Sequence, residues 1–128
     1  MSEHALPSIL INDFSENDIL RLPPDFYKKA STYLSKSDIK KIQKAYTLAF
    51  YAHEGQLRRD GSKYITHPVA VSNILLDLKM DPDSICAALM HDVLEDCDVN
   101  KNNLKKLFGD SVAEIVDGVS KLGKLDIT

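Results

Sequence analysis

Hydrophobic residues recur every three or four positions along most of the chain after residue 23, which is the spacing of helices packed on one side. Proline, glycine and short polar residues divide this pattern into segments. The predicted helices span 24–34, 39–54, 68–79, 82–96, 100–109 and the stretch from 110 onward. No segment alternates with a period of two over a useful length. The pattern therefore predicts an all-α protein of five or six helices joined by short loops.

Two of these helices carry clear end signals. Asp81 followed by Pro82 is typical of an N-cap and a first-turn proline, and Gly55 suits a left-handed cap after the long second helix. In the helix 68–79, the residues expected to face the core are Val69, Val71, Ile74, Leu75 and Leu78. Residues 1–22 are weakly patterned, so we expect a loosely ordered lead-in followed by one domain over 23–128.

Composition agrees with a single soluble domain. The 128 residues are 44% hydrophobic and 27% charged, and the net charge of −3 argues against direct nucleic-acid binding. Cys86 and Cys97 are eleven residues apart along one predicted helix, too far for a disulfide, so reduced thiols are expected. We find no secretory signal and no apolar run long enough to span a membrane, and we expect a cytoplasmic protein without membrane contact.

The end of the helix 82–96 concentrates ionisable groups. On a helical wheel four of them share one face beside small alanines: His91, Asp92, Glu95 and Asp96. A helix C-terminus already carries partial negative charge, so these carboxylates repel it and one another unless a divalent cation binds. A solvated acidic face with a chance histidine explains this segment equally well.

His67 favours the metal interpretation. If 68–79 and 82–96 form an antiparallel hairpin, the chain rises about 20 Å from His67 to the turn and returns about 15 Å to His91. The two imidazoles then lie within about one helical turn, and together with Asp92 they suit a transition metal. On its own, His67 reads as a helix-capping residue. His53, at the end of a long helix, is better explained by the helix dipole than as a ligand, and His4 lies in the lead-in.

A basic cluster precedes His67 in an otherwise acidic chain. Arg58, Arg59 and Lys63 lie in the polar loop 55–66, where arginine could bind phosphate oxygens or stack on a base. An ordinary solvated loop is the alternative. The position beside the presumed metal site favours a role in binding an anionic substrate.

Three segments resemble one family closely: AHEGQLRRDGSKYITHPVAV, AALMHDVLED and FGDSVAEIVDGVSKLGK. They look like the HD hydrolase domain of bifunctional Rel/SpoT enzymes, nearly without gaps over 45–125. The resemblance implies an all-helical HD-domain bundle and manganese-dependent hydrolysis of ppGpp or pppGpp to GDP or GTP and pyrophosphate. In the synthetase-only RelA branch the HD and ED pairs are lost, whereas both are intact here.

The same resemblance implies roles for individual residues. His67, His91 and Asp92 would bind Mn²⁺, and Glu95 and Asp96 would activate or position the attacking water. Arg58, with Arg59, would contact the guanine nucleotide. Lys63 stands where the family commonly has proline, which adds charge and loosens the loop.

A fourth metal ligand, an Asp in a later helix, is expected beyond residue 128. The chain then corresponds to the first part of an HD domain, truncated before its later helices. We expect the 128 residues alone to retain metal weakly, to have little hydrolase activity and to self-associate through an uncovered apolar surface. Two alternatives stay open: an HD phosphohydrolase for another nucleotide, and a non-catalytic regulatory or protein-binding module.

Overall fold

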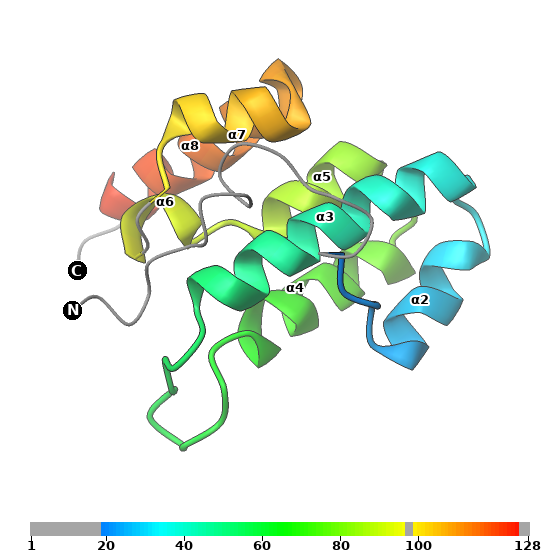
Figure 1. Ribbon diagram of the computed structural model, residues 1–128, viewed down its shortest axis with the longest axis horizontal. Helices are drawn as coiled ribbons and strands as arrows, with labels where there is room; N and C mark the ends of the chain where they lie inside the picture. The colour runs from blue at the N-terminus through cyan, green and yellow to red at the C-terminus, as the bar shows by residue number, and fades with distance from the viewer. Residues whose placement is uncertain (1–18, 97–98, 126–128) are drawn as a thin grey trace.

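The computed structural model describes residues 19–96 and 99–125 (Figure 1). Its helices are α2 (Pro24–Ser31), α3 (Lys36–Ala52), α4 (Thr66–Asp77), α5 (Pro82–Leu89), α6 (Val93–Asp96), α7 (Lys101–Phe108) and α8 (Asp110–Leu125). Within the described ranges, extended pairing is limited to one isolated bridge between Leu57 and Lys63. The all-α prediction is confirmed. None of these helices is both long and apolar enough to cross a membrane.

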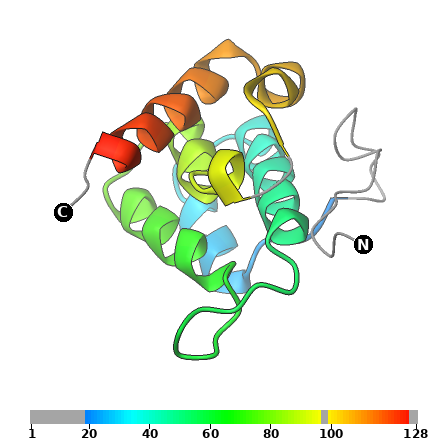
Figure 2. The same ribbon diagram turned by 90° about the vertical axis from the view of Figure 1, so that its left-hand side faces the viewer.

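Helix α5 lies at the centre, in contact with α3, α4 and α8 (Figure 2). Ile85, Cys86 and Leu89 on this helix are fully buried. Asp81 caps its start as predicted, since its carboxylate accepts a hydrogen bond from the Ser84 backbone N–H at 3.1 Å. Because α5 is buried, it forms a rigid support for His91 and Asp92, which follow its C-terminal end.

The outer helices are also capped by their own sequence. Ser35 and Asp38 form a reciprocal capping box at the start of α3. Asn100 accepts a hydrogen bond from the Asn103 backbone N–H, and Gly109 ends α7 at a φ of 93°. Helix α8 packs against α7 and crosses α5. Both ends of α7 lie within one residue of the predicted ones, and α3 begins three residues earlier than predicted.

The predicted single helix 82–96 is wrong. Helix α5 ends at Leu89 and α6 begins at Val93, so His91 and Asp92 lie in a turn. In an unbroken helix, the Ala88 carbonyl would accept from the Asp92 backbone N–H. Here the His91 ring nitrogen Nδ1 contacts that carbonyl oxygen at 2.8 Å instead. A side chain thus takes over the carbonyl at the point where the helix ends.

Helix α4 differs from its prediction in start and face. It begins at Thr66, before the proline, so His67 lies in its first turn. Ile74 and Leu78, expected inside, are 60% and 65% exposed. Apolar residues occur on several sides of this helix, and the packing against α5 and α2 selects Pro68, Ser72 and Leu76 as its buried residues.

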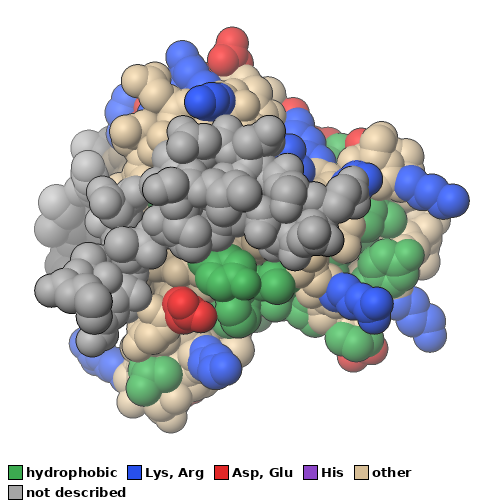
Figure 3. All heavy atoms as spheres, viewed as in Figure 1, with side chains coloured by type: hydrophobic (Ala, Val, Ile, Leu, Met, Phe, Trp, Pro, Cys, Tyr) green, Lys and Arg blue, Asp and Glu red, His purple; other side chains and the backbone are tan. Residues whose placement is uncertain are grey.

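The lead-in is described only from residue 19. The Leu20 backbone N–H donates to the Thr47 hydroxyl of α3 at 2.9 Å, and the Leu22 side chain is buried. The remaining residues of the predicted loose segment 1–22 lie outside the described part of the structure. On the face shown in Figure 3, the Lys and Arg side chains of the described residues lie at several separate places.

Candidate metal centre

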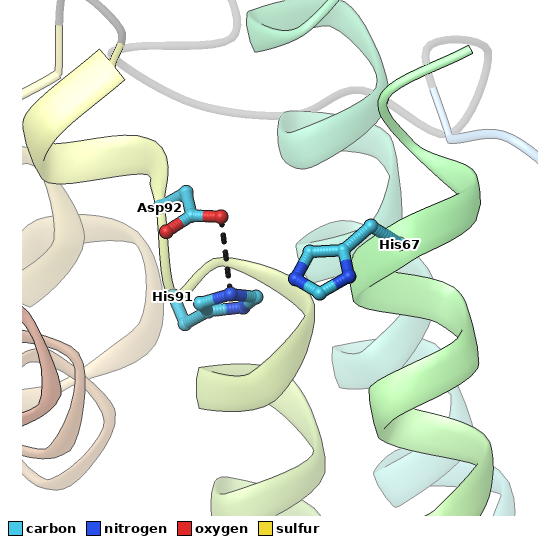
Figure 4. A group of neighbouring side chains, drawn as sticks. All are labelled: His67, His91 and Asp92. Carbon is cyan, nitrogen blue, oxygen red and sulfur yellow. Dashed lines mark ion pairs between the residues drawn. The ribbon is translucent and has the colours of Figure 1, made fainter. Parts of the chain in front are cut away.

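His67, His91 and Asp92 converge in space although 24 positions separate the two histidines (Figure 4). Each side chain offers one ligand atom, and these atoms lie within 4.8 Å of one another. The two imidazole ring centroids are 5.3 Å apart. Helix α4 carries His67, and the turn between α5 and α6 carries the other two. The approach of the histidines predicted from the hairpin is therefore present.

The ring of His91 has a defined hydrogen-bonding direction. Its Nδ1 atom lies 2.8 Å from the carbonyl oxygen of Ala88, which can only accept, so Nδ1 carries the hydrogen. The Nε2 atom lies 3.0 Å from Oδ2 of Asp92 and faces the cluster. Because Nδ1 is held by the carbonyl, Nε2 is the ring nitrogen that can bind a metal, once the proton between it and Asp92 is released.

Asp92 is held as an anion. Its Oδ2 atom accepts a hydrogen bond from the Tyr64 hydroxyl and lies beside His91. Burial would raise the pKa of this carboxyl, but the hydrogen bonds from His91 and Tyr64 outweigh burial and hold the pKa at about 2. The side chain therefore offers a negatively charged oxygen at any physiological pH.

The surroundings of His67 favour its neutral form. Burial lowers its pKa below the usual range, and the nearby positive charges of Arg58 and His91 lower it further. A neutral imidazole has a lone pair available for a cation. Two imidazole nitrogens and one carboxylate oxygen suit a first-row transition metal, so the residues present fit a divalent metal ion.

The loop 55–65 projects from the helical body beside this cluster (Figures 1 and 2). The bridge between Leu57 and Lys63 closes it, and Gly61 turns it at a φ of 88°, a conformation that favours glycine. A cavity of about 540 Å³ is lined by Leu57, Arg58, Arg59, Asp60, Tyr64 and His67. Two of the three predicted basic residues thus share a cavity with a predicted metal ligand.

Lys63 lies elsewhere. It lines a smaller cavity of about 140 Å³, together with His53 and Gln56. Leu57, which pairs with Lys63 across the loop, lines both cavities. The structure therefore does not bring all three basic residues to one cavity.

Glu95 and Asp96 follow the cluster directly, in α6. Their side chains fall outside the described part of the structure, so their predicted roles stay predictions. His53 is buried, its Nδ1 lies 3.1 Å from Oε1 of Gln56, and the three-residue cluster found among the described residues does not include it. This position agrees with the structural role expected for His53.

Comparison with known proteins identifies the family. A family model described as an HD domain matches residues 45–128, about two thirds of the chain. The chain belongs to the HD-domain family. Guanosine-3′,5′-bis(diphosphate) 3′-pyrophosphohydrolase of Vibrio cholerae is 53% identical over 96 residues, which cover 75% of the chain and 14% of that protein.

Two further relatives extend the similarity. Bifunctional (p)ppGpp synthase/hydrolase SpoT of Escherichia coli is 53% identical over 73% of the chain and 13% of its own length. GTP pyrophosphokinase of Streptomyces coelicolor is 45% identical over 72% of the chain and 11% of its own length. The matched region thus spans about one seventh or less of the length of each of these relatives. The resemblance to Rel/SpoT enzymes is confirmed over this region.

Sequence reasoning missed Tyr64 in this HD domain. Its hydroxyl contacts Asp92, and its ring stacks on His53 with centroids 4.5 Å apart. A tyrosine three residues before a candidate ligand carries no general signal of metal chemistry. Only the folding of the loop against the turn after α5 brings Tyr64 to Asp92.

Proposed function

We propose that this HD domain removes pyrophosphate from the 3′ position of ppGpp or pppGpp in a manganese-dependent reaction, as part of a Rel/SpoT-like enzyme. The observation that carries the proposal is the convergence of His67, His91 and Asp92 beside a cavity lined by Arg58 and Arg59. The similarity to enzymes named for the hydrolysis of guanosine-3′,5′-bis(diphosphate) and (p)ppGpp supports the choice of substrate. The higher identity to the hydrolases than to the pyrophosphokinase supports the choice of reaction.

His67, His91 and Asp92 are proposed to hold the metal. When bound, a divalent ion at such a site lowers the pKa of a water molecule and offsets negative charge on the reacting phosphate. The mixed nitrogen and oxygen ligands are compatible with manganese. Family resemblance favours manganese over other divalent ions.

The remaining residues are proposed to orient the nucleotide and move a proton. Arg58 and Arg59 bind the guanine nucleotide through its phosphate oxygens or its base. A water oxygen bonds to the phosphorus attached to the ribose 3′ oxygen, and Glu95 accepts a proton from that water. The bond from this phosphorus to the 3′ oxygen breaks, and the 3′ oxygen takes up a proton. The products are pyrophosphate and GDP or GTP, while Asp96 helps to position the water.

The test measures the turnover of ppGpp by the full-length protein in the presence of manganese. His91→Ala and Asp92→Ala are expected to lose turnover and bound manganese while keeping their helical circular dichroism. Asp77→Ala is the matched control, because Asp77 is an exposed carboxylate at the far end of α4 that forms an ion pair with Lys29. Unchanged turnover in either site variant would exclude this metal site. Faster turnover of another nucleotide in a panel would favour the alternative HD phosphohydrolase.

A further inference from the structure

Tyr64 occupies the junction between the basic loop and the candidate metal centre. Its backbone N–H donates to the Gln56 carbonyl at 3.1 Å, and its own carbonyl accepts from the His67 backbone N–H at 3.0 Å. Both sides of the residue are therefore fixed by the backbone, one to the loop and one to the first turn of α4.

The Tyr64 ring is also fixed. It stacks on buried His53 at an interplanar angle of 27°, and its edge meets the His67 ring with centroids 6.1 Å apart. A ring held on two sides has little rotational freedom, so its hydroxyl projects in one direction. That direction ends at Oδ2 of Asp92, to which the hydroxyl donates.

Asp92 needs such support more than its neighbours do. His91 is oriented by the Ala88 carbonyl, and His67 is anchored in the first turn of a regular helix. Asp92 lies in the turn between α5 and α6, where the helical ladder is interrupted. The Tyr64 hydroxyl is a contact to its carboxylate from an element distant in sequence. Such contacts orient ligand groups before an ion arrives.

We propose that Tyr64 is a positioning residue that holds the Asp92 carboxylate for metal binding through its hydroxyl, while His53 supports its ring. The inference rests on the proposed metal site. Tyr64 does not itself bind the ion in this assignment. It acts through Asp92, and its effect should therefore appear in metal affinity before it appears in the rate at saturating metal.

The experiment compares Mn²⁺ affinity in the unmodified protein, Tyr64→Phe and Tyr33→Phe, by electron paramagnetic resonance of free Mn²⁺. Tyr64→Phe removes only the hydroxyl and keeps the ring that stacks on His53. Tyr33→Phe is the matched control, because it removes a hydroxyl that donates to the Met80 carbonyl, remote from the site. Loss of an outer hydrogen-bond partner typically weakens metal affinity by 10- to 100-fold, and we expect about that change in Tyr64→Phe alone.

Two further readouts separate positioning from general structure. Excess Mn²⁺ should restore most of the turnover of Tyr64→Phe, and its melting temperature without metal should match that of Tyr33→Phe. In the unmodified protein, the Tyr64 hydroxyl proton should exchange with water slowly enough to be observed by nuclear magnetic resonance. An unchanged affinity in Tyr64→Phe, an equal loss in Tyr33→Phe, or a fast-exchanging Tyr64 hydroxyl overturns the inference and leaves the proposed function intact. An unmodified protein that binds no divalent ion overturns both.

Discussion

The imidazole Nδ1 of His91 lies 2.8 Å from the carbonyl oxygen of Ala88, three residues earlier in the chain. This one contact coincides with the end of α5 and leaves Nε2 turned toward Asp92 and His67. A local hydrogen bond thus links the break in the helix to the direction of a candidate metal ligand. The predicted continuous helix would have left the Ala88 carbonyl bonded to backbone and the ring without this support.

This contact predicts the tautomer of His91. Nδ1 should carry hydrogen in every state, and Nε2 should be the nitrogen that binds a metal. Long-range ¹H–¹⁵N spectra of the protein with and without Zn²⁺ should show the metal-induced shift at Nε2 of His91. A shift at Nδ1 would contradict the orientation described for this ring.

The two cavities at the basic loop, one lined by Arg58 and one by Lys63, should differ in nucleotide binding. Arg58→Ala is expected to weaken ppGpp binding by roughly 10-fold, the lower end for a hydrogen bond to a charged group, because Arg58 lines the cavity with His67. Lys63→Ala removes the same formal charge from a residue that lines a different cavity, and it should change affinity by less than about threefold.

Calorimetry on metal-free protein measures this difference without turnover. Equal losses in the two variants would mean that the nucleotide depends on the net charge of the loop, rather than on the cavity that contains Arg58.

Cys86 should be chemically inert in the folded protein. The side chain is fully buried in α5, and burial raises the pKa of its thiol from 9.0 to about 12. In a Cys97→Ser background, a thiol reagent at pH 8 should label Cys86 roughly 10³-fold more slowly than in urea, because stable domains open rarely. Rapid labelling of the native protein would contradict this burial.

The same shift sets a pH dependence with a definite sign. The folded pKa is raised, so the contribution of the neutral thiol to stability is complete below the unfolded pKa. It is lost as the pH rises from about 9 toward 12, because the unfolded chain releases the proton first. The free energy of unfolding should fall across this window less steeply in Cys86→Ala, as urea titrations at several pH values would show.

The two leucines Leu89 and Leu78 test which faces form the core. Leu89→Ala should lower the free energy of unfolding by about 2–5 kcal/mol, since it leaves a cavity in fully buried α5. Leu78→Ala is the same chemical change at a side chain that is 65% exposed, and its effect should stay within about 0.5 kcal/mol. Comparable losses by urea unfolding would mean that Leu78 is covered in solution.

Much of the helical framework could be predicted because its signals are local. The cap at Asp81 satisfies a backbone N–H three residues away, so residue type and order are sufficient to locate it. The inward face of α4 could not be predicted in the same way. Ile74 and Leu78 are as apolar as buried Leu76, and only contact with α5 and α2 distinguishes them.

For the candidate site, the sequence alone predicted that His67 and His91 approach each other, because two helices in an antiparallel hairpin return the chain to the level where it started. Asp92 follows His91 directly and so belongs to the same predicted cluster. The tertiary structure decided how the three side chains are held. It put His91 and Asp92 in a turn rather than a helix, placed Lys63 and Arg58 in the linings of different cavities, and brought Tyr64 to Asp92 from 28 positions away. Helix length and hairpin return follow from backbone geometry, whereas side-chain direction depends on packing between segments that the linear pattern does not relate.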